Sequence, residues 1–365
     1  MSASDRSNAT ATPTGGFMRK LTWLIGVAAT VALAAGCGSS SSGGSSGSPS
    51  GGSKVLIGAG STFVAPLVQA WEADYAKSPA AVTVTYGAIG SGGGIDQITA
   101  RAVDFGASDA PLTPDQATAC KDCVQIPWAL GATAVLYNVK GAPNNLKLTG
   151  PVLANIYLGK VTSWNDPSIA ALNPGVTLPS THITPVYRSD GSGTSFVFTD
   201  YLSSVSPDWA SKVGTSTQPT FPTGTGAEHS SGVIASMQAT DGAITYAETA
   251  YIAADSLDFA LIQNAAGQYE QPTTKAVLAA AAAGTARPDG TLKLVNPPAS
   301  AATAYPLSSY TYVIVPKTSS KAAVIKAFLT YAVGTTGQAF GPPAYPELPA
   351  GVVSSDQKLI AEIHS

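Results

Sequence analysis

The sequence contains few charged residues, few histidines and few cysteines for its length. Only 11% of its 365 residues are charged, whereas about a quarter is usual in globular proteins. Lysine and arginine are scattered and the formal net charge is -3, so the basic face expected of a nucleic-acid-binding protein is missing. The length and the apolar fraction of 44% are sufficient for two domains with separate cores.

The scarcity of histidine and cysteine argues against a metal site. Cys120 and Cys123 form a single C-x-x-C motif, and the three histidines are far apart in the sequence. A zinc site of this type needs a second pair of ligands. In an exported protein the plain interpretation of this pair is a local structural disulfide. The glycine-rich GSGGG lacks the G-K-[ST] ending of a phosphate-binding P-loop, and we expect neither a metal nor a cofactor.

A nucleophile paired with a base is also missing, so the sequence does not predict an enzyme. The stretch DGSGTS lacks the G-x-S-x-G spacing of a hydrolase nucleophile, and a serine hydrolase would need a histidine partner. The one plausible partner is His229, which we interpret as an exposed residue in a loop of Gly, Ser and Thr.

Long apolar runs are absent except for one near the start. Arg19 and Lys20 precede LTWLIGVAATVALAAG, and Cys37 follows it. This run is shorter than a membrane span requires and is typical of a secretory signal peptide. A membrane-spanning anchor is the alternative. Because Met18 heads the run so closely, either Met1 or Met18 is the true start.

The residues before Cys37 resemble the lipobox of bacterial lipoproteins, although Ala34 stands where leucine is commoner. We expect a signal peptide over 1–36, palmitate or another lipid on Cys37, and a Gly/Ser tether over 37–53. Such a tether is too polar to bury a core. The expected location is extracytoplasmic, with attachment to the cell membrane through the lipid only.

Beyond residue 54, strand patterns alternate with helix patterns. KVLIGAG reads as a strand, and the helix after it has an apolar stripe made of Val64, Leu67, Val68, Trp71 and Tyr75. Thr113 with Gln116 predicts a capping box at another helix start. Further strands are expected at VTVTY, ATAVLYNV, ITPVY, GAITYA and YTYVIVP. This alternation predicts an α/β fold with a mainly parallel sheet.

Several strand-to-helix turns are rich in Gly, Ser and Thr, namely GAGSTF, IGSGGG and DGSGTSF, and GASDAPL is a further turn. Each alone is most simply a polar turn. Ligands bind at the carboxyl ends of strands in open α/β sheets, so together the turns predict a cradle for one small oxyanion. Its donors would be backbone N–H groups, the guanidinium of Arg188, and the hydroxyls of Thr62, Ser91, Ser192 and Thr194.

Asp109 is unexpected beside an anion, because it would repel it. Phosphate keeps a proton at neutral pH and can donate a hydrogen bond to a carboxylate, whereas sulfate has no proton to donate. Asp109 therefore favours phosphate, and Asp190 is expected to pair with Arg188 and fix its orientation. The alternatives are a receptor for sulfate or molybdate, a phosphatase or phosphoryl transferase with the same cradle, and a surface protein used for adhesion.

Five longer motifs resemble one known family: GAGSTFVAPL, YGAIGSGGG, VDFGASDAPL, IYLGKVTSWND and YRSDGSGTSFVFTDYL. They resemble the PstS family, the phosphate-binding lipoproteins of bacterial phosphate-specific ABC transporters. The resemblance runs from about Val55 to Ala250 and returns at YPLSSYTYVIV, while 252–304 is divergent. It implies phosphate contacts from Thr62, Phe63 (through its backbone), Ser91, Asp109, Arg188, Ser192, Gly193 and Thr194.

The resemblance also implies a two-lobed periplasmic-binding-protein fold of type II that closes on its ligand by a hinge. Lobe 1 would be 54–129 plus 307–365, and lobe 2 would be 130–306. The implied activity is high-affinity binding of inorganic phosphate and its delivery to the permease and ATPase subunits of an ABC importer. We expect a monomer that does not bind nucleic acid.

Overall fold

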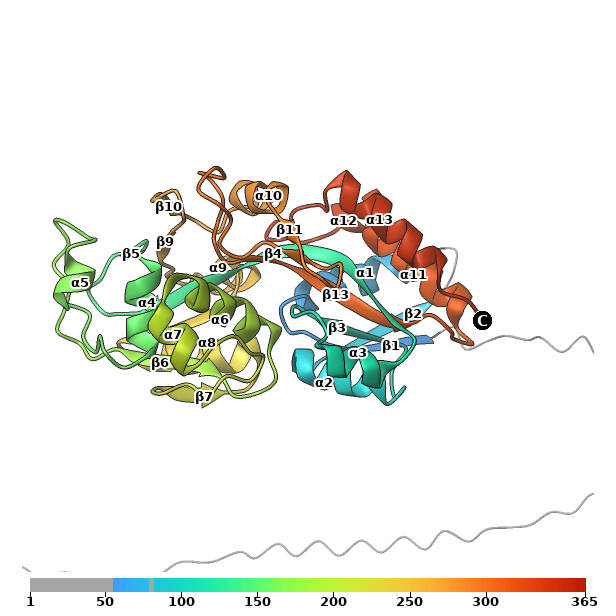
Figure 1. Ribbon diagram of the computed structural model, residues 1–365, viewed down its shortest axis with the longest axis horizontal. Helices are drawn as coiled ribbons and strands as arrows, with labels where there is room; N and C mark the ends of the chain where they lie inside the picture. Colours follow the sequence, from blue (N-terminus) through green and yellow to red (C-terminus); the bar gives the residue numbers. More distant parts are fainter. Residues whose placement is uncertain (1–54, 79–81) are drawn as a thin grey trace, which may run out of the picture. The chain divides into compact units, whose positions relative to one another are not determined.

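An eight-stranded mixed sheet runs through the computed structural model, which describes residues 55–78 and 82–365 (Figure 1). The predicted signal peptide over 1–36, the lipidated Cys37 and the tether over 37–53 lie outside these residues. Within the described ranges, no helix combines the length and the apolarity that crossing a bilayer requires.

The first half of the sheet carries the N-terminal motifs. Its strands, in spatial order, are β2 (Thr83–Ala88), β1 (Val55–Gly60), β3 (Phe105–Ser108) and β13 (Ser308–Pro316). The helices that connect or cover them are α1 (Ala65–Tyr75), α2 (Gly90–Thr99), α3 (Pro114–Cys120), α11 (Ala322–Val333), α12 (Thr335–Ala339) and α13 (Ala350–Ala361). The predicted stripe of α1 is confirmed, since Leu67, Val68, Trp71 and Tyr75 are buried.

The second half of the sheet contains β8 (Ala243–Glu248), β6 (Thr184–Arg188) and β7 (Thr225–Ala227). Around it lie α4 (Gly150–Tyr157), α5 (Pro167–Ala170), α6 (Gly193–Val205), α7 (Pro207–Lys212), α8 (His229–Ala239) and α9 (Ala250–Asp255). The ring of Phe198 on α6 stacks on Tyr246 of β8, with 4.2 Å between centroids. This contact holds α6 against the sheet.

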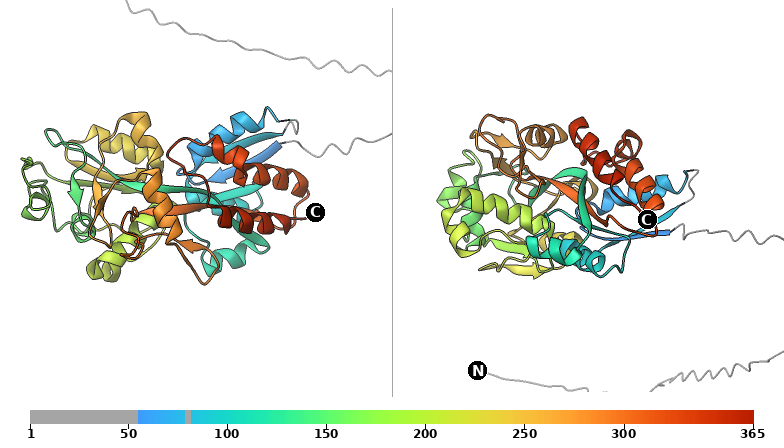
Figure 2. Two further views of the ribbon diagram at one scale, coloured as in Figure 1. Left: turned by 90° about the horizontal axis from the view of Figure 1, so that it is seen from above. Right: turned by 45° about the vertical axis from the view of Figure 1, so that its right-hand side comes forward.

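One long strand joins the two halves (Figure 2). β4 (Cys123–Asn138) pairs with β13 as far as Ala132 and with β8 from Thr133 onward. Both pairings are antiparallel, as is that of β13 with β3, while the other four neighbouring pairs are parallel. The expectation of a mainly parallel sheet is therefore only partly correct. Strands buried on both faces read as the same apolar runs in either direction, so the sequence pattern does not fix their orientation.

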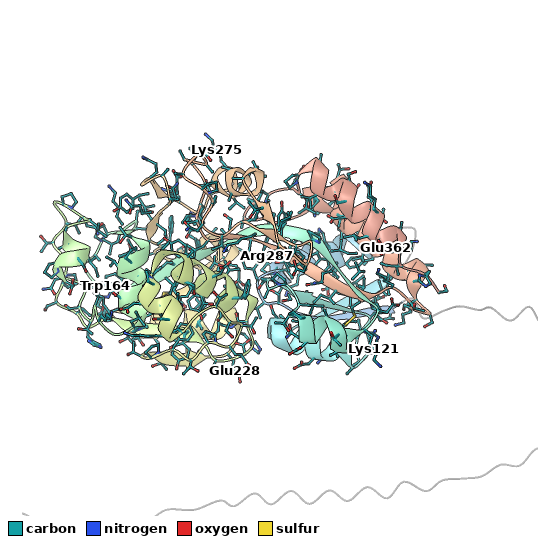
Figure 3. All side chains as sticks on the ribbon, viewed as in Figure 1. Lys121, Trp164, Glu228, Lys275, Arg287 and Glu362 are labelled. Carbon is teal, nitrogen blue, oxygen red and sulfur yellow. A yellow bond between two sulfur atoms is a disulfide. The ribbon has the colours of Figure 1, made fainter. Side chains whose placement is uncertain are left out.

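The divergent stretch packs against α6 rather than forming a separate body. It contains β9 (Leu261–Gln263), β10 (Tyr269–Glu270), α10 (Thr274–Ala282), β11 (Thr285–Ala286) and β12 (Leu292–Lys293), and β9 also pairs with β5 (Lys147–Leu148). Arg287, labelled in Figure 3, and Lys293 both pair with Asp200 of α6, at 3.4 and 3.0 Å. These two ion pairs tie the stretch to the helix.

The α3 region has both features expected from its sequence. Thr113 and Gln116 form the predicted capping box at the start of α3. A disulfide joins Cys120 and Cys123 at its other end, and Arg101 donates from Nη1 to Cys123 Sγ at 3.2 Å. The pair lies at the junction of α3 and β4 and contacts none of the cradle residues.

Asp356 of α13 makes the stability of the protein sensitive to pH. Its carboxyl is buried, and neither oxygen has a hydrogen-bond partner among the described residues. Burial raises the pKa of Asp356 to about 8, against about 4 in an unfolded chain. Between these values the folded state binds more protons, so the free energy of unfolding falls as pH rises from about 4 to about 8.

We therefore expect Asp356→Asn to be more stable than wild type at pH 8, with a melting temperature higher by about 2–4 °C for each kcal/mol of stability gained. The advantage should shrink as the pH is lowered toward about 5. Calorimetric melting at both pH values measures it, with the exposed Asp255→Asn as the matched control. An equal advantage at both pH values would contradict the assignment to ionisation of Asp356.

Candidate anion-binding site

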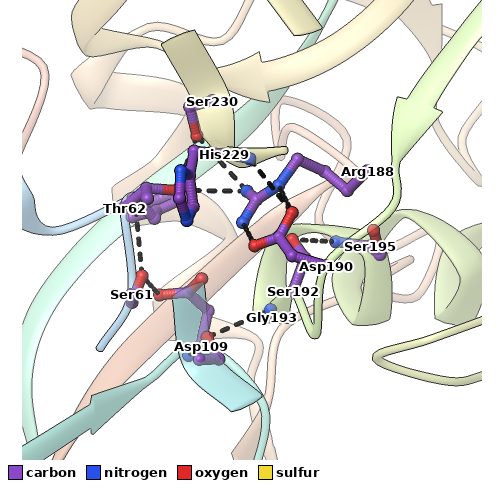
Figure 4. Close-up of polar contacts among 12 residues, drawn as sticks. Ser61, Thr62, Asp109, Arg188, Asp190, Ser192, Gly193, Ser195, His229 and Ser230 are labelled. Carbon is purple, nitrogen blue, oxygen red and sulfur yellow. Dashed lines mark hydrogen bonds and ion pairs between the residues drawn. The ribbon is translucent and has the colours of Figure 1, made fainter. Parts of the chain in front are cut away.

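Two helix starts from opposite halves of the sheet meet at one point, and Figure 4 shows the polar residues around Ser192 and Gly193 at the start of one of them. α2 begins at Gly90 and α6 at Gly193, and the N–H of Gly92 donates to the carbonyl of Gly191 at 2.8 Å. Ser192 caps α6 by accepting from the N–H of Ser195 at 3.1 Å. Helix N-termini carry unpaired N–H groups and partial positive charge, so this junction favours an anion.

Glycine is required at this junction because the backbones approach closely. A Cβ on Gly193 would lie 2.6 Å from both the backbone nitrogen and the Cβ of Asp109. Gly90 has a φ of +85°, and a side chain there would collide with the carboxylate of Asp190. Larger residues would therefore separate the two halves at the point where they touch.

Arg188, at the end of β6, is the cation of the site and is only 3% exposed. Its Nε donates to Asp190 Oδ1 at 2.6 Å, and Nη2 pairs with the second oxygen of the same carboxylate. Nη1 points the other way and donates to Thr62 Oγ1 at 3.1 Å. Burial alone would lower the pKa of Arg188, but the hydrogen bonds and charge of Asp190 outweigh it, so its pKa is raised.

Asp109 is a buried carboxylate with one committed oxygen. Its Oδ1 accepts from Ser61 Oγ at 2.5 Å and from Thr311 Oγ1 at 2.9 Å. Burial raises the pKa of Asp109 to about 6, although these two hydroxyls and the charge of Arg188 act in the opposite direction. At neutral pH the group is thus an anion held in place by neutral donors.

Ser91 and Thr194 present hydroxyls for a ligand. Ser91 Oγ accepts from the N–H of Gly193 at 3.0 Å and of Asp109 at 3.3 Å, so its own hydrogen remains for another acceptor. Thr194 Oγ1 is buried and has no hydrogen-bond partner among residues 55–78 and 82–365. A buried hydroxyl without a partner is costly, which favours a ligand that accepts from it.

Phe63 differs from expectation in one respect. Its backbone N–H, which the family resemblance makes a ligand donor, donates to Ser61 Oγ at 3.0 Å. Its carbonyl accepts from the hydroxyl of Tyr345, and its side chain is fully buried. The backbone at Phe63 is therefore held rigidly on both sides.

Comparison with known proteins identifies the family. Residues 39–336 match the model of the PBP superfamily domain. The phosphate-binding protein PstS of Xylella fastidiosa (strain Temecula1) is 40% identical over 277 residues, covering 76% of this chain and 76% of the relative. That of Haemophilus influenzae is 35% identical over 304 residues, covering 82% and 90%. The chain belongs to the PstS family.

Solved structures confirm the predicted α/β, two-lobed periplasmic-binding-protein fold of the PstS family. A phosphate ABC transporter substrate-binding protein from Clostridium perfringens has a TM-score of 0.60 at 19% identity, covering 81% of this chain and 100% of that chain. The phosphate-bound periplasmic protein PfluDING has a TM-score of 0.66 at 19% identity, covering 83% and 93%.

The PstS-family motifs converge in space, but they leave out several residues of the site. Sequence reasoning missed Ser61, Thr311, Ser230 and Glu248. Ser230 Oγ lies 2.8 Å from Thr62 Oγ1 and 2.8 Å from Glu248 Oε2. Ser61 lies inside the motif GAGSTF, so it could have been predicted from the sequence. Thr311 and Glu248 lie in strands and read as ordinary core positions.

The interpretation of His229 as an exposed loop residue was wrong. It is the half-buried first residue of α8, with a φ of 63°. Its backbone N–H donates to Asp190 Oδ1 at 3.0 Å, and it precedes Ser230 of the site. His229 therefore supports the carboxylate that orients Arg188.

A cavity away from these residues lies beside β13 and α13. It has a volume of about 910 Å³, is lined by residues of α10, α13 and β13, and includes none of the PstS-family site residues. In the described ranges no cluster of His, Cys, Asp and Glu has the geometry to hold a metal ion.

Proposed function

We propose that this protein binds inorganic phosphate outside the cytoplasm and delivers it to the permease of an ABC importer. The observation that carries the proposal is a buried set of polar groups where two helices start. Arg188 donates to Thr62, Ser91 Oγ accepts from the backbone N–H groups of Gly193 and Asp109, and Thr194 Oγ1 is buried without a hydrogen-bond partner among the described residues. The relatives named phosphate-binding protein PstS support it, as does the bound phosphate of two structural neighbours.

The charges of the site suit a protonated oxyanion. Arg188 is neutralised by Asp190, so the ligand is held by directed donors rather than by net charge. Charge-assisted hydrogen bonds contribute about 1.5–3 kcal/mol each, so several together are compatible with tight binding. Asp109 accepts a hydrogen bond from the remaining O–H of the ligand, which phosphate has and sulfate lacks.

Two lobes closing by a hinge account for the contacts between distant segments. We assign 54–129 plus 307–365 to one lobe and 130–306 to the other, with the boundary inside β4. The bonds of Gly92 to Gly191, of Ser91 to Gly193 and of Thr62 to Arg188 then all cross between lobes. Opening the hinge would break these bonds and admit the ligand.

Titration calorimetry of the mature domain with phosphate, arsenate and sulfate tests the proposal. We expect tight binding of phosphate and arsenate, no binding of sulfate, and a smaller radius of gyration by X-ray scattering with phosphate. Tight binding of sulfate or molybdate instead would make this a receptor for another oxyanion. Hydrolysis of a phosphate ester by the protein would instead show that it is a phosphatase.

Gly193→Ala should weaken phosphate binding by at least about tenfold, because the added methyl would push α6 away from Asp109 and hold the lobes apart. Calorimetric titration measures the loss. The matched control is Gly232→Ala in α8, where a Cβ finds its nearest neighbour at an ordinary 3.7 Å. Equal affinities of the two variants would show that closure at this point is not needed for binding.

Lipidation of Cys37 is the proposed attachment to the membrane. Cys37→Ala should move the protein from the membrane fraction to the soluble fraction and leave phosphate affinity unchanged, because the Gly/Ser tether over 37–53 separates anchor and site. Fractionation followed by immunoblotting measures it. If the variant stays in the membrane fraction, the apolar run before Cys37 is the anchor and not the lipid.

A further inference from the structure

A relay of three oxygen-bearing side chains leads from the anion site to a second buried carboxyl. Thr62 Oγ1 lies 2.8 Å from Ser230 Oγ, and Ser230 Oγ lies 2.8 Å from Glu248 Oε2. Arg188 Nη1 contacts both hydroxyls, at 3.1 and 3.4 Å. Figure 4 shows Thr62, Ser230 and Arg188 side by side. Glu248, at the end of β8, is 0% exposed.

Each hydroxyl in this relay has one hydrogen to give, so the charge of Glu248 sets the direction of the whole chain. When Glu248 is ionised, Ser230 must donate to it, and Thr62 must then donate to Ser230. The hydrogen of Thr62 is in that case committed inside the protein. An ionised Glu248 also adds a negative charge next to the anion site.

A neutral Glu248 reverses the relay. Its Oε1 is buried without a partner among the described residues, so a proton on Oε2, which has Ser230 as an acceptor, is favoured over one on Oε1. Oε2–H then donates to Ser230, and Ser230 donates to Thr62. The hydrogen of Thr62 becomes available to the anion while Arg188 stays in place.

We propose that Glu248 is a positioning residue whose protonation turns the hydroxyls of Ser230 and Thr62 toward the anion, so that phosphate binding to the protein with ionised Glu248 takes up one proton from solvent. This inference rests on the proposed phosphate-binding function. No bond other than the O–H bond on Glu248 forms, and the anion is not chemically changed.

The groups around Glu248 are compatible with this role. Burial raises the pKa of Glu248 to about 8; its hydrogen bonds and Arg188 oppose the rise, and Asp109 adds to it. Tyr251 and Tyr345 also face Glu248, and their own pKa values are raised, mainly by burial. A bound phosphate dianion would raise the pKa of Glu248 further by repulsion.

The expected pH dependence has a definite sign. Between about pH 8 and about pH 10, phosphate is a singly protonated dianion and Asp109 is ionised, so neither changes its charge. Glu248 loses its proton in the free protein over this range and keeps it in the complex. The affinity for phosphate should therefore fall by nearly tenfold per pH unit above about pH 8.

Calorimetry with inorganic phosphate in two buffers of different ionisation enthalpy tests this at about pH 9. For wild type the apparent binding enthalpy should depend on the buffer and correspond to uptake of close to one proton. Glu248→Gln keeps the shape, is permanently neutral and should show a buffer-independent enthalpy and a flat pH profile. The exposed Glu347→Gln should behave as wild type does.

Infrared difference spectroscopy of wild type keeps the test independent of whether Glu248→Gln folds. Phosphate binding at about pH 9 should produce the carbonyl band of a newly protonated carboxylic acid. If phosphate binds but neither this band nor the buffer dependence is seen, the relay inference is overturned and the proposed function stands. If phosphate does not bind to wild type at all, the proposed function itself fails.

Discussion

Replacing Arg188 with alanine is expected to weaken phosphate binding by about 10²- to 10³-fold. Loss of one partner of a buried, hydrogen-bonded charge pair costs about 2–5 kcal/mol. Arg188 is 3% exposed and paired through two nitrogens with Asp190. The variant loses a donor to the anion and also leaves an uncompensated carboxylate beside it. Calorimetric titration with phosphate at neutral pH measures the change.

The double variant Arg188→Ala/Asp190→Asn should recover part of this loss, because the second change removes the unpaired carboxylate. Losses that simply add in the double variant would show that the two side chains act independently. Arg101→Ala serves as the control, since it removes an exposed arginine whose side chain contacts Ile98, Cys120 and Cys123. Its phosphate affinity should equal that of wild type.

Asp109→Asn is expected to create sulfate binding where wild type has none, shrinking the preference for phosphate by at least about 100-fold. In wild type, Asp109 Oδ1 accepts hydrogen bonds from Ser61 and Thr311. The carbonyl oxygen of an asparagine can accept the same two bonds. The amide nitrogen then replaces the second carboxylate oxygen, so repulsion is removed and a donor is gained. Competition of sulfate against labelled phosphate at neutral pH measures the change.

Acidification should have a similar effect on wild type. The pKa of Asp109 is about 6, so below that pH its carboxyl is protonated and sulfate exclusion should weaken in wild type. In Asp109→Asn, the affinity for sulfate should not change as the pH is lowered through this range. The exposed Asp115→Asn, in α3, is the matched control. Complete exclusion of sulfate by Asp109→Asn at neutral pH would mean that another residue discriminates between the two anions.

Those parts of the candidate site that lie in continuous turns could be predicted from the sequence. Thr62, Ser91, Asp109 and the Arg188 to Thr194 stretch follow strand patterns in Gly-, Ser- and Thr-rich segments. Turns after strands lie at one edge of an α/β sheet, whatever the details of packing. The apolar stripe of α1 and the capping box at Thr113 were predictable for the same reason, because both depend on spacing within one helix.

The directions of β4 and β13, and the strand residues that join the candidate site, could not be predicted from the sequence and are seen in the folded structure. Thr311 and Glu248 lie in apolar strands, and nothing near them in the sequence marks them as polar partners of a site. Ser230 and Thr62 are 168 residues apart yet in hydrogen-bond contact. Such contacts follow from strand register and from the meeting of the two halves of the sheet, which depend on long-range packing and not on local pattern.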